Sequence, residues 1–273
     1  MFIVQSFGGA SESRVEQTCY SNILIVFLTV LGTVSGPRLV ERSKRIEIMK
    51  WDIVIARYRE DISWIRKPEF DCFNKFVYNK GPPDDFGDDT KVFNIPNVGR
   101  ECHTFLYHIV ENYDSIADLT VFVPGSCMDE LKVTSTKMLL SRVHESGDTV
   151  LPGKWYSPDV VSVLRNFKIA SWSGTNDKNR ENLPQKKCRA SLVSPFGSWF
   201  KNHFGNVQIN VVCFNSMFAV SKSHVRQKPS SHYSLLLNCL NDHSNPEDGH
   251  FMERSWQAVF YPIPVSHLET RAH

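Results

Sequence analysis

A glycine, an arginine and a glutamate precede an apolar stripe of helical spacing in the segment PNVGRECHTFLYHI, residues 96–109. Free amides at the start of a helix attract anions, and phosphate is the usual one. Gly99 lets the chain turn tightly, and Arg100 can add a bidentate contact to a phosphate. The alternative is plain helix punctuation, in which Glu101 complements the helix dipole. Spacing alone favours the alternative, because one glycine is weak evidence for an anion site.

A second cluster of ionisable side chains lies in NPEDGHFMERSW, residues 245–256. Glu253 stands among apolar and aromatic residues that include Trp256. A carboxylate held against aromatic rings can have a raised pKa and can serve as a general base, with His250 as a secondary candidate. The alternative is an exposed Glu253 that pairs with Arg254 or His250.

Two further groups have metal-ligand chemistry. The segment PPDDFGDD, residues 82–89, offers four carboxylates that can hold Mg²⁺ or Mn²⁺ against a diphosphate, although a solvated acidic loop is the plainer interpretation. Cys102, His103 and His108 do not have the i, i+4 spacing of a zinc-binding helix. We therefore assign no metal site from these residues.

The composition excludes some partners. Lys and Arg number 31 against 29 Asp and Glu, so the chain has no basic excess for nucleic-acid binding. The seven cysteines are scattered and form no C-x-x-C pair, which favours buried thiols and a reducing compartment over a zinc knuckle. A cytoplasmic location is therefore favoured.

The first 48 residues qualify this expectation. Residues 23–34, ILIVFLTVLGTV, form an apolar run that is shorter than the roughly 18–20 residues that span a bilayer. The run matches a signal-peptide core in length, and membrane association through it, in the secretory pathway, is the alternative. We favour an N-terminal extension over residues 1–48 and a domain over residues 49–273.

The spacing of apolar residues predicts an α/β fold. Strands are expected at 51–58, 73–81, 91–97 and 119–125, with a short helix near Asp61 and a longer one at 101–113. Alternating strands and helices favour a mostly parallel sheet flanked by helices, which binds ligands where its strands end. The residues at that edge are Arg57, Tyr58, Asn79, Lys80, Asn97, Arg100, Gly125 and Ser126.

The second half of the chain is less regular. The expected elements are a helical and loop-rich stretch at 127–165, a polar loop at 175–187, a strand at 207–214, a strand leading into a helix at 217–225, a helix at 231–240, a turn at 245–250 and a final helix at 251–260.

Several motifs occur in a fixed order over residues 50–262: DIVIARYRED, VYNKG, NVGRECHTFLYHI, PFGSWF, MFAVSKSHV and GHFMERSW. Together they resemble a family of uncharacterised proteins found in fungi and large DNA viruses. They are also similar to the nucleotide-sugar glycosyltransferases of GT-A architecture, which have a single Rossmann-like domain.

The resemblance implies roles for particular residues. Glu253 would be the catalytic base, and Ser126 and Trp256 would lie on the acceptor side; His250 remains the second catalytic candidate. The donor and its diphosphate would be bound by Arg57, Tyr58, Lys80, Asn97, Gly99 and Arg100.

Two positions depart from the glycosyltransferase pattern. The stretch VFVPGSCMD, residues 121–129, lacks the Asp-x-Asp expected after the fourth strand, so a requirement for Mn²⁺ or Mg²⁺ is left open. The segment before MFAVS is often glycine-rich, and here it is Cys213-Phe214-Asn215-Ser216. The leading hypothesis is transfer of a sugar from a nucleotide sugar to a glycan or protein acceptor. The alternative is a non-catalytic carbohydrate- or nucleotide-binding module of the same fold.

Overall fold

The computed structural model describes residues 49–169 and 188–270. The expected extension at 1–48, with its apolar run at 23–34, and the polar loop expected at 175–187 lie outside the described residues. Within the two described ranges, no helix has the length and apolar character needed to cross a bilayer.

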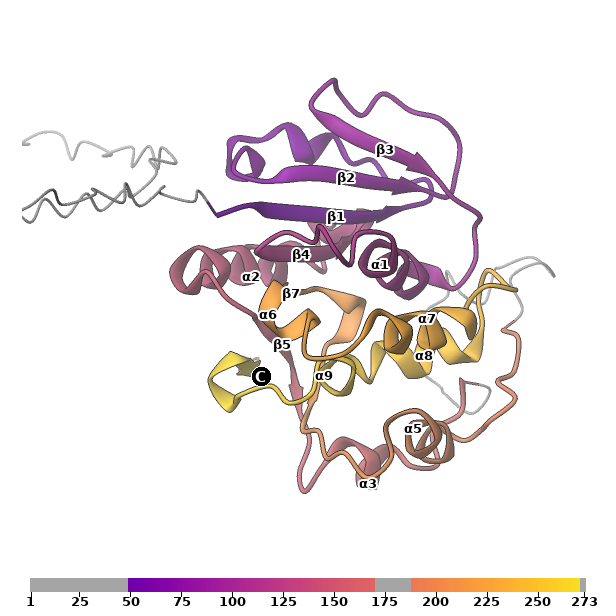
Figure 1. Cartoon of the computed structure of the whole chain (residues 1–273). Coiled ribbons are helices and arrows are strands. Elements are labelled where there is room, and N and C mark those ends of the chain that lie inside the picture. The colour runs from indigo at the N-terminus through magenta and orange to yellow at the C-terminus, as the bar shows by residue number, and fades with distance from the viewer. Residues whose placement is uncertain (1–48, 170–187, 271–273) are drawn as a thin grey trace, which may run out of the picture. The chain divides into compact units, whose positions relative to one another are not determined.

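A five-stranded sheet in the order β3-β2-β1-β4-β7 forms the centre of the domain (Figure 1). Its strands are β1 (Trp51–Arg57), β2 (Asn74–Asn79), β3 (Thr90–Asn94), β4 (Leu119–Pro124) and β7 (Phe218–Ser221). The first four run parallel, and β7 pairs antiparallel with β4. The prediction of an α/β fold with a mostly parallel sheet is confirmed.

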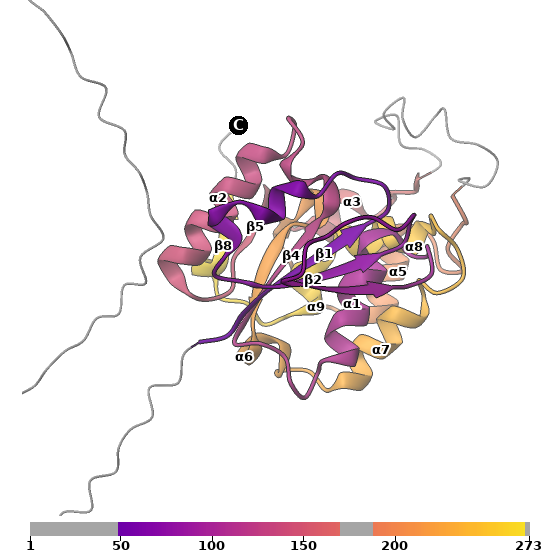
Figure 2. The same cartoon turned by 90° about the horizontal axis from the view of Figure 1, so that it is seen from above.

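Helices cover both faces of this sheet (Figure 2). Val54 and Ala56 of β1 share one core with α1 (Arg100–Glu111) and α7 (Ser230–Asn238). The alternate residues Ile53 and Ile55 share a second core with α2 (Val133–Ser146) on the opposite face. Successive side chains of a strand point to opposite faces, so residues 53–56 of β1 are all apolar because both faces are buried.

A smaller sheet has the order β6-β5-β8. Its strands are β6 (Val211–Val212), β5 (Leu151–Trp155) and β8 (Leu268–Thr270). The remaining helices and 3-10 turns are η1 (Ser63–Arg66), η2 (Pro68–Phe70), η3 (Gly125–Met128), α3 (Val160–Leu164), α5 (Phe196–Phe204), η6 (Phe214–Ser216), α6 (Lys222–Val225), α8 (Glu247–Glu253), α9 (Trp256–Val259) and η7 (Val265–His267).

The structure corrects several expectations for the second half. The stretch 127–165 contains strand β5, and the strand expected at 207–214 shortens to β6. The turn expected at 245–250 is wrong, because α8 begins at Glu247 and continues to Glu253. The helix expected at 251–260 is therefore divided between α8 and α9.

The physical reason lies in the acidic residues of this segment. Pro246 is the N-cap of α8, and Glu247 and Asp248 occupy its first turn, where negative charge is favourable. Both carboxylates are buried and hydrogen-bonded rather than solvated. Asp248 accepts from Trp199 Nε1 at 2.9 Å, and Glu247 accepts from the amide of Ser191 at 3.0 Å.

Candidate functional site at the carboxyl edge of the sheet

Four segments that are far apart in sequence meet where the parallel strands end. The register of the sheet places Arg57 opposite Asn79, and Ala56 opposite Pro124. Helix α1 begins at this edge. The turn η6 directly precedes β7, whose first residue pairs with Phe122 near the end of β4. Helix α8 also reaches this edge, because its last residue, Glu253, accepts a hydrogen bond from Asn215 of η6.

Two glutamates, which we call the acidic pair, are held by consecutive residues of η6. The amide of Asn215 donates to Glu253 Oε1 at 2.8 Å, and Ser216 Oγ donates to Glu101 Oε1 at 3.2 Å. Glu253 is the last residue of α8, and Glu101 lies in the first turn of α1. Their side chains are only 15% and 16% exposed. The acidic pair is therefore positioned by one main-chain amide and one side-chain hydroxyl of η6, and it is largely shielded from water.

Each member of the acidic pair has a neighbouring guanidinium. Arg100 Nε lies 3.7 Å from Glu101 Oε2, and an Nη atom of Arg254 lies 3.6 Å from Glu253 Oε2. Arg254 is 4% exposed and donates to the carbonyl of His250 at 2.8 Å, so it is fixed within the protein. Arg100 is 30% exposed, which makes it the more accessible cation of the two.

The surroundings of the acidic pair shift the two pKa values in opposite directions. Burial raises the pKa of Glu253, and the negative charge of Glu101 raises it further. Burial also acts to raise the pKa of Glu101, but the charge of Arg100 and the hydrogen bond from its own amide outweigh burial and lower it. Two carboxylates with diverging pKa values are a recurrent arrangement in acid–base catalysis.

The backbone around the acidic pair is strained. Among the described residues, the non-glycine positions with positive φ are Arg100 (54°), Asn215 (65°) and Ser216 (50°), and all three belong to this site. Such conformations cost of order 1–3 kcal/mol each and cluster at functional sites. Asn215 and Ser216 thus adopt a backbone conformation that glycine favours. They lie in the segment before MFAVS, where the glycosyltransferase pattern is often glycine-rich.

Gly99 serves packing rather than an open anion site. Its φ is +61°, and an added Cβ would lie 2.6 Å from the Cβ atoms of both His103 and Leu240. Its amide donates to the carbonyl of His243 at 2.8 Å. The amide that the sequence suggested for phosphate is therefore already bonded.

Lys80, which follows β2, braces the same turn. Its ammonium donates to the carbonyl of Val98 at 2.6 Å and to the carbonyl of Arg100. Burial lowers the pKa of Lys80 to about 7, although the charge of Glu101 acts in the opposite direction. The side chain expected to bind a diphosphate thus holds the strained backbone next to the acidic pair.

His250 and Trp256 support the site from within the core. His250 Nε2 lies 2.9 Å from Asn245 Oδ1, and burial with the nearby charge of Arg100 lowers its pKa to about 3. Trp256 is fully buried and donates from Nε1 to Ser216 Oγ at 3.3 Å. The neutral imidazole is a hydrogen-bonding group at neutral pH, and the indole orients the hydroxyl that binds Glu101.

The remaining edge residues differ in their burial and in their hydrogen-bond partners. Arg57 is buried and donates to Asn79 Oδ1 at 2.9 Å and to Asp84 Oδ2 at 2.7 Å. Ser126 accepts from Lys132 Nζ at 2.6 Å. Tyr58 is half-buried and Asn97 is exposed.

Three of the four carboxylates in the acidic loop at 82–89 form ion pairs with basic side chains. Its ion pairs are Asp84 with Arg57 at 2.7 Å, Asp85 with Arg66 at 2.8 Å and Asp89 with Lys75 at 2.6 Å. In each ion pair a basic side chain balances the carboxylate charge that would otherwise attract a metal ion. The loop therefore matches the plainer interpretation of the sequence.

Cys102 and His108 are likewise occupied by protein contacts. Cys102 Sγ lies 3.5 Å from the carbonyl of Gly249, and His108 Nδ1 lies 2.9 Å from the hydroxyl of Tyr78. Burial raises the pKa of the Cys102 thiol and lowers that of His108 to about 3. These residues stabilise the packing of α1.

Sequence reasoning did not include Glu101, Asn215 or Ser216 among the site residues. The sequence relates Glu101 only to the helix dipole, because no local pattern places a second carboxylate beside it. Asn215 was the sequence feature that could have indicated a strained turn at this site, since asparagine adopts positive φ more readily than most residues.

These observations define an α/β protein that carries a shielded pair of carboxylates where its parallel strands end. Residues 53–271 match the model of the family described as "Protein of unknown function (DUF3431)", so the chain belongs to this family. The chain is also similar to the "Early 94 kDa protein" of Autographa californica nuclear polyhedrosis virus, with 27% identity over 144 residues. That match covers 46% of this chain and 17% of the viral protein, so the chain spans less than two thirds of its relative.

Proposed function

We propose that the protein is a glycosyltransferase-like enzyme that transfers a sugar from a nucleotide-diphosphate donor to a hydroxyl of a glycan or protein. The observation that carries the proposal is the geometry of the acidic pair, in which two shielded carboxylates are held by consecutive residues of η6. The strand order β3-β2-β1-β4-β7 supports it, because α/β sheets bind ligands at the edge where this pair lies.

Glu253 is assigned as the general base. It removes the proton of the acceptor hydroxyl while the oxygen forms a bond to the anomeric carbon of the sugar. The bond between that carbon and the diphosphate breaks, and its electron pair leaves with the diphosphate. A raised pKa makes a carboxylate a stronger base near neutral pH. The 15% exposure of Glu253 allows contact with a substrate while limiting competing water.

Arg100 is assigned to the leaving diphosphate. With no Asp-x-Asp after β4, cationic side chains must offset much of the developing negative charge. Arg100 is the accessible guanidinium of the site, and its hydrogen bond to Asn245 Oδ1 is long, at 3.4 Å. Glu101 stays ionised beside it, orients the guanidinium and raises the pKa of Glu253.

The test compares Glu253→Gln with Glu69→Gln, which removes an exposed carboxylate on η2. Full-length protein is assayed for release of free nucleotide from a panel of nucleotide-diphosphate sugars, with mixed glycan acceptors and with or without Mn²⁺. Donor binding is measured separately by the rise in melting temperature. Glu253→Gln should slow transfer by roughly 10²–10⁴-fold and retain donor binding, while Glu69→Gln should behave as wild type.

The same experiment separates the two hypotheses. Wild-type transfer by Glu253→Gln would remove Glu253 from the role of base. Stabilisation of the wild type by a donor without any nucleotide release would favour the non-catalytic binding module, which the missing Asp-x-Asp also favours.

A further inference from the structure

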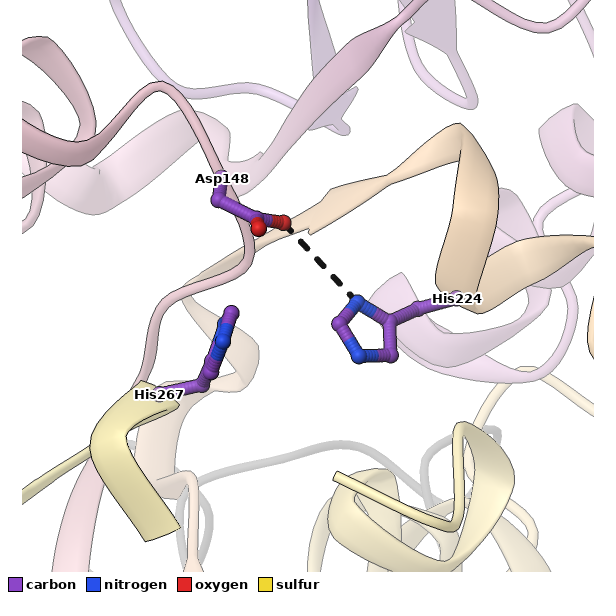
Figure 3. Close-up of side chains that lie close together, drawn as sticks. All are labelled: Asp148, His224 and His267. Atoms are coloured by element: carbon purple, nitrogen blue, oxygen red, sulfur yellow. Dashed lines mark ion pairs between the residues drawn. The ribbon is translucent and has the colours of Figure 1, made fainter. Parts of the chain in front are cut away.

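A second cluster of ionisable side chains lies at the opposite edge of the sheet, independent of the proposed activity. Asp148 follows α2, His224 belongs to α6 and His267 belongs to η7 (Figure 3). Each offers one ligand atom, and these atoms all lie within 4.8 Å of one another. The adjacent Ser221 pairs with Leu119, the first residue of β4, so this edge is the one where β4 begins.

The imidazole of His267 is oriented by a main-chain carbonyl. His267 Nδ1 lies 2.9 Å from the carbonyl oxygen of Thr149. A carbonyl only accepts hydrogen bonds, so Nδ1 carries the proton and Nε2 keeps its lone pair. Metal-binding histidines use this arrangement, in which the second ring nitrogen donates to a carbonyl or carboxylate.

His224 is held by two hydroxyls. Its Nδ1 lies 2.8 Å from Thr149 Oγ1 and 3.0 Å from Ser221 Oγ, and the amide of Ser221 donates to the same threonine hydroxyl at 2.9 Å. The residue is 7% exposed, so these contacts fix the ring within the protein.

Asp148 supplies the negative charge. Its Oδ1 lies 3.9 Å from His224 Nδ1 and accepts from the amide of Thr149 at 2.6 Å. Asp148 also lines a pocket of about 480 Å³ together with Ser221 and Ser223. The pocket gives an ion a path from solvent to the carboxylate.

We propose that Asp148, His224 and His267 bind a divalent transition-metal ion, for which Zn²⁺ is the best match. Imidazole and carboxylate are the ligands of many zinc sites, and three protein ligands leave one position for water. Bonds of about 2.1 Å place tetrahedral ligand atoms about 3.4 Å apart. The ligand atoms lie within 4.8 Å of one another, so binding shortens their separations by up to about 1.4 Å. Asp148 lies in a loop and is 45% exposed, so it has the freedom to move.

The ion would join three segments that are distant in sequence. Asp148 directly precedes the Thr149–Val150 link into β5, and His267 directly precedes β8. Strands β5 and β8 pair through Leu151 and Leu268. The ion would tie this pairing to α6, so it should stabilise the C-terminal part of the domain.

The test uses full-length protein treated with a chelator and dialysed. Binding of Zn²⁺ is measured by calorimetry, and Co²⁺ is titrated as a coloured substitute that reports tetrahedral nitrogen and oxygen ligands. The decisive variants are His267→Gln and Asp148→Asn, because both residues are partly exposed and their replacement should leave the fold intact. His144→Gln, which removes an exposed histidine on α2, is the matched control.

Wild-type protein and His144→Gln should bind one equivalent of metal and melt at a higher temperature when Zn²⁺ is present. Each decisive variant should lose roughly tenfold or more in affinity, as expected for loss of a ligand or its orientation. Unchanged binding in both decisive variants would place the metal on cysteines or other histidines and overturn the proposal. Absence of saturable binding to the wild type would also overturn it.

Discussion

Replacement of Gly99 by alanine should destabilise the protein more than the same change at a glycine with identical backbone geometry. Gly99 has φ 61° and ψ 20°, and Gly147, the C-cap of α2, has φ 62° and ψ 20°. Placing alanine in the left-handed conformation costs about 1–2 kcal/mol of stability, and this cost is the same at both positions. The two sites differ in what the new methyl group meets.

The surroundings set the expected difference. At Gly99 the added Cβ would lie 2.6 Å from Leu240 Cβ and 2.7 Å from the Leu240 carbonyl oxygen, so the backbone must shift. At Gly147 the nearest atom is Trp51 Cζ2 at 3.9 Å, which is an ordinary contact. Overpacking typically costs about 1–3 kcal/mol. Gly99→Ala should therefore lose about 2–5 kcal/mol of unfolding free energy, against about 1–2 for Gly147→Ala.

Urea-induced unfolding of both variants measures this difference directly. For a domain of about 150–250 residues, each kcal/mol moves the melting temperature by roughly 2–4 °C. Gly99→Ala should also impair nucleotide release, because the shift displaces Arg100 and Glu101, while Gly147→Ala should leave it unchanged. Equal destabilisation of the two variants would refute the packing explanation for Gly99.

Three further predictions concern buried polar groups. Arg57→Met should cost about 2–3 kcal/mol in urea unfolding, because the hydrogen-bond acceptors of the buried guanidinium lose their donor; a loss below about 0.5 kcal/mol would contradict this. Burial lowers the pKa of His108 to about 3, below the usual 6.5, so the folded state resists protonation and stability is lost as the pH falls from about 6.5 towards 3. His108→Gln should reduce that slope by up to about 1.4 kcal/mol per pH unit, and an unchanged slope would show that this histidine does not contribute. Iodoacetamide should modify the exposed Cys72 in the native protein and Cys102 only after unfolding, because Cys102 is buried with a raised pKa; mass spectrometry of native and unfolded samples checks the order.

The first half of the fold was predictable because its segments have one clear periodicity each. The stripe at Phe105, Leu106 and Ile109 does lie in the core, as helical spacing requires. β5 was missed because Leu151-Pro152-Gly153 reads as a turn, yet it pairs on both sides. The start of α8 was missed because Pro246 and the acids after it were interpreted as a turn, although the same residue types also begin helices.

The candidate site was predictable only in part. The apolar neighbours of Glu253, a local property of the sequence, made it a candidate base, and the resemblance to glycosyltransferases implied the same role. Its relation to Glu101 depends on η6, whose residues Asn215 and Ser216 bind one carboxylate each. No local pattern connects positions separated by this much chain, so neither the acidic pair nor its opposite pKa shifts followed from spacing.

The distance along the chain between the parts of the site has a consequence for how the protein matures. Ser216 and Glu101, which are joined by a hydrogen bond, are 115 residues apart, and Glu253 follows later still. Contacts of such long sequence separation form slowly, because a large loop must close first. During synthesis from the N-terminus, β1 to β4 and α1 are available well before α8 leaves the ribosome. The incomplete chain therefore holds one carboxylate without the other, and any activity of the site should emerge only after the last helices have packed.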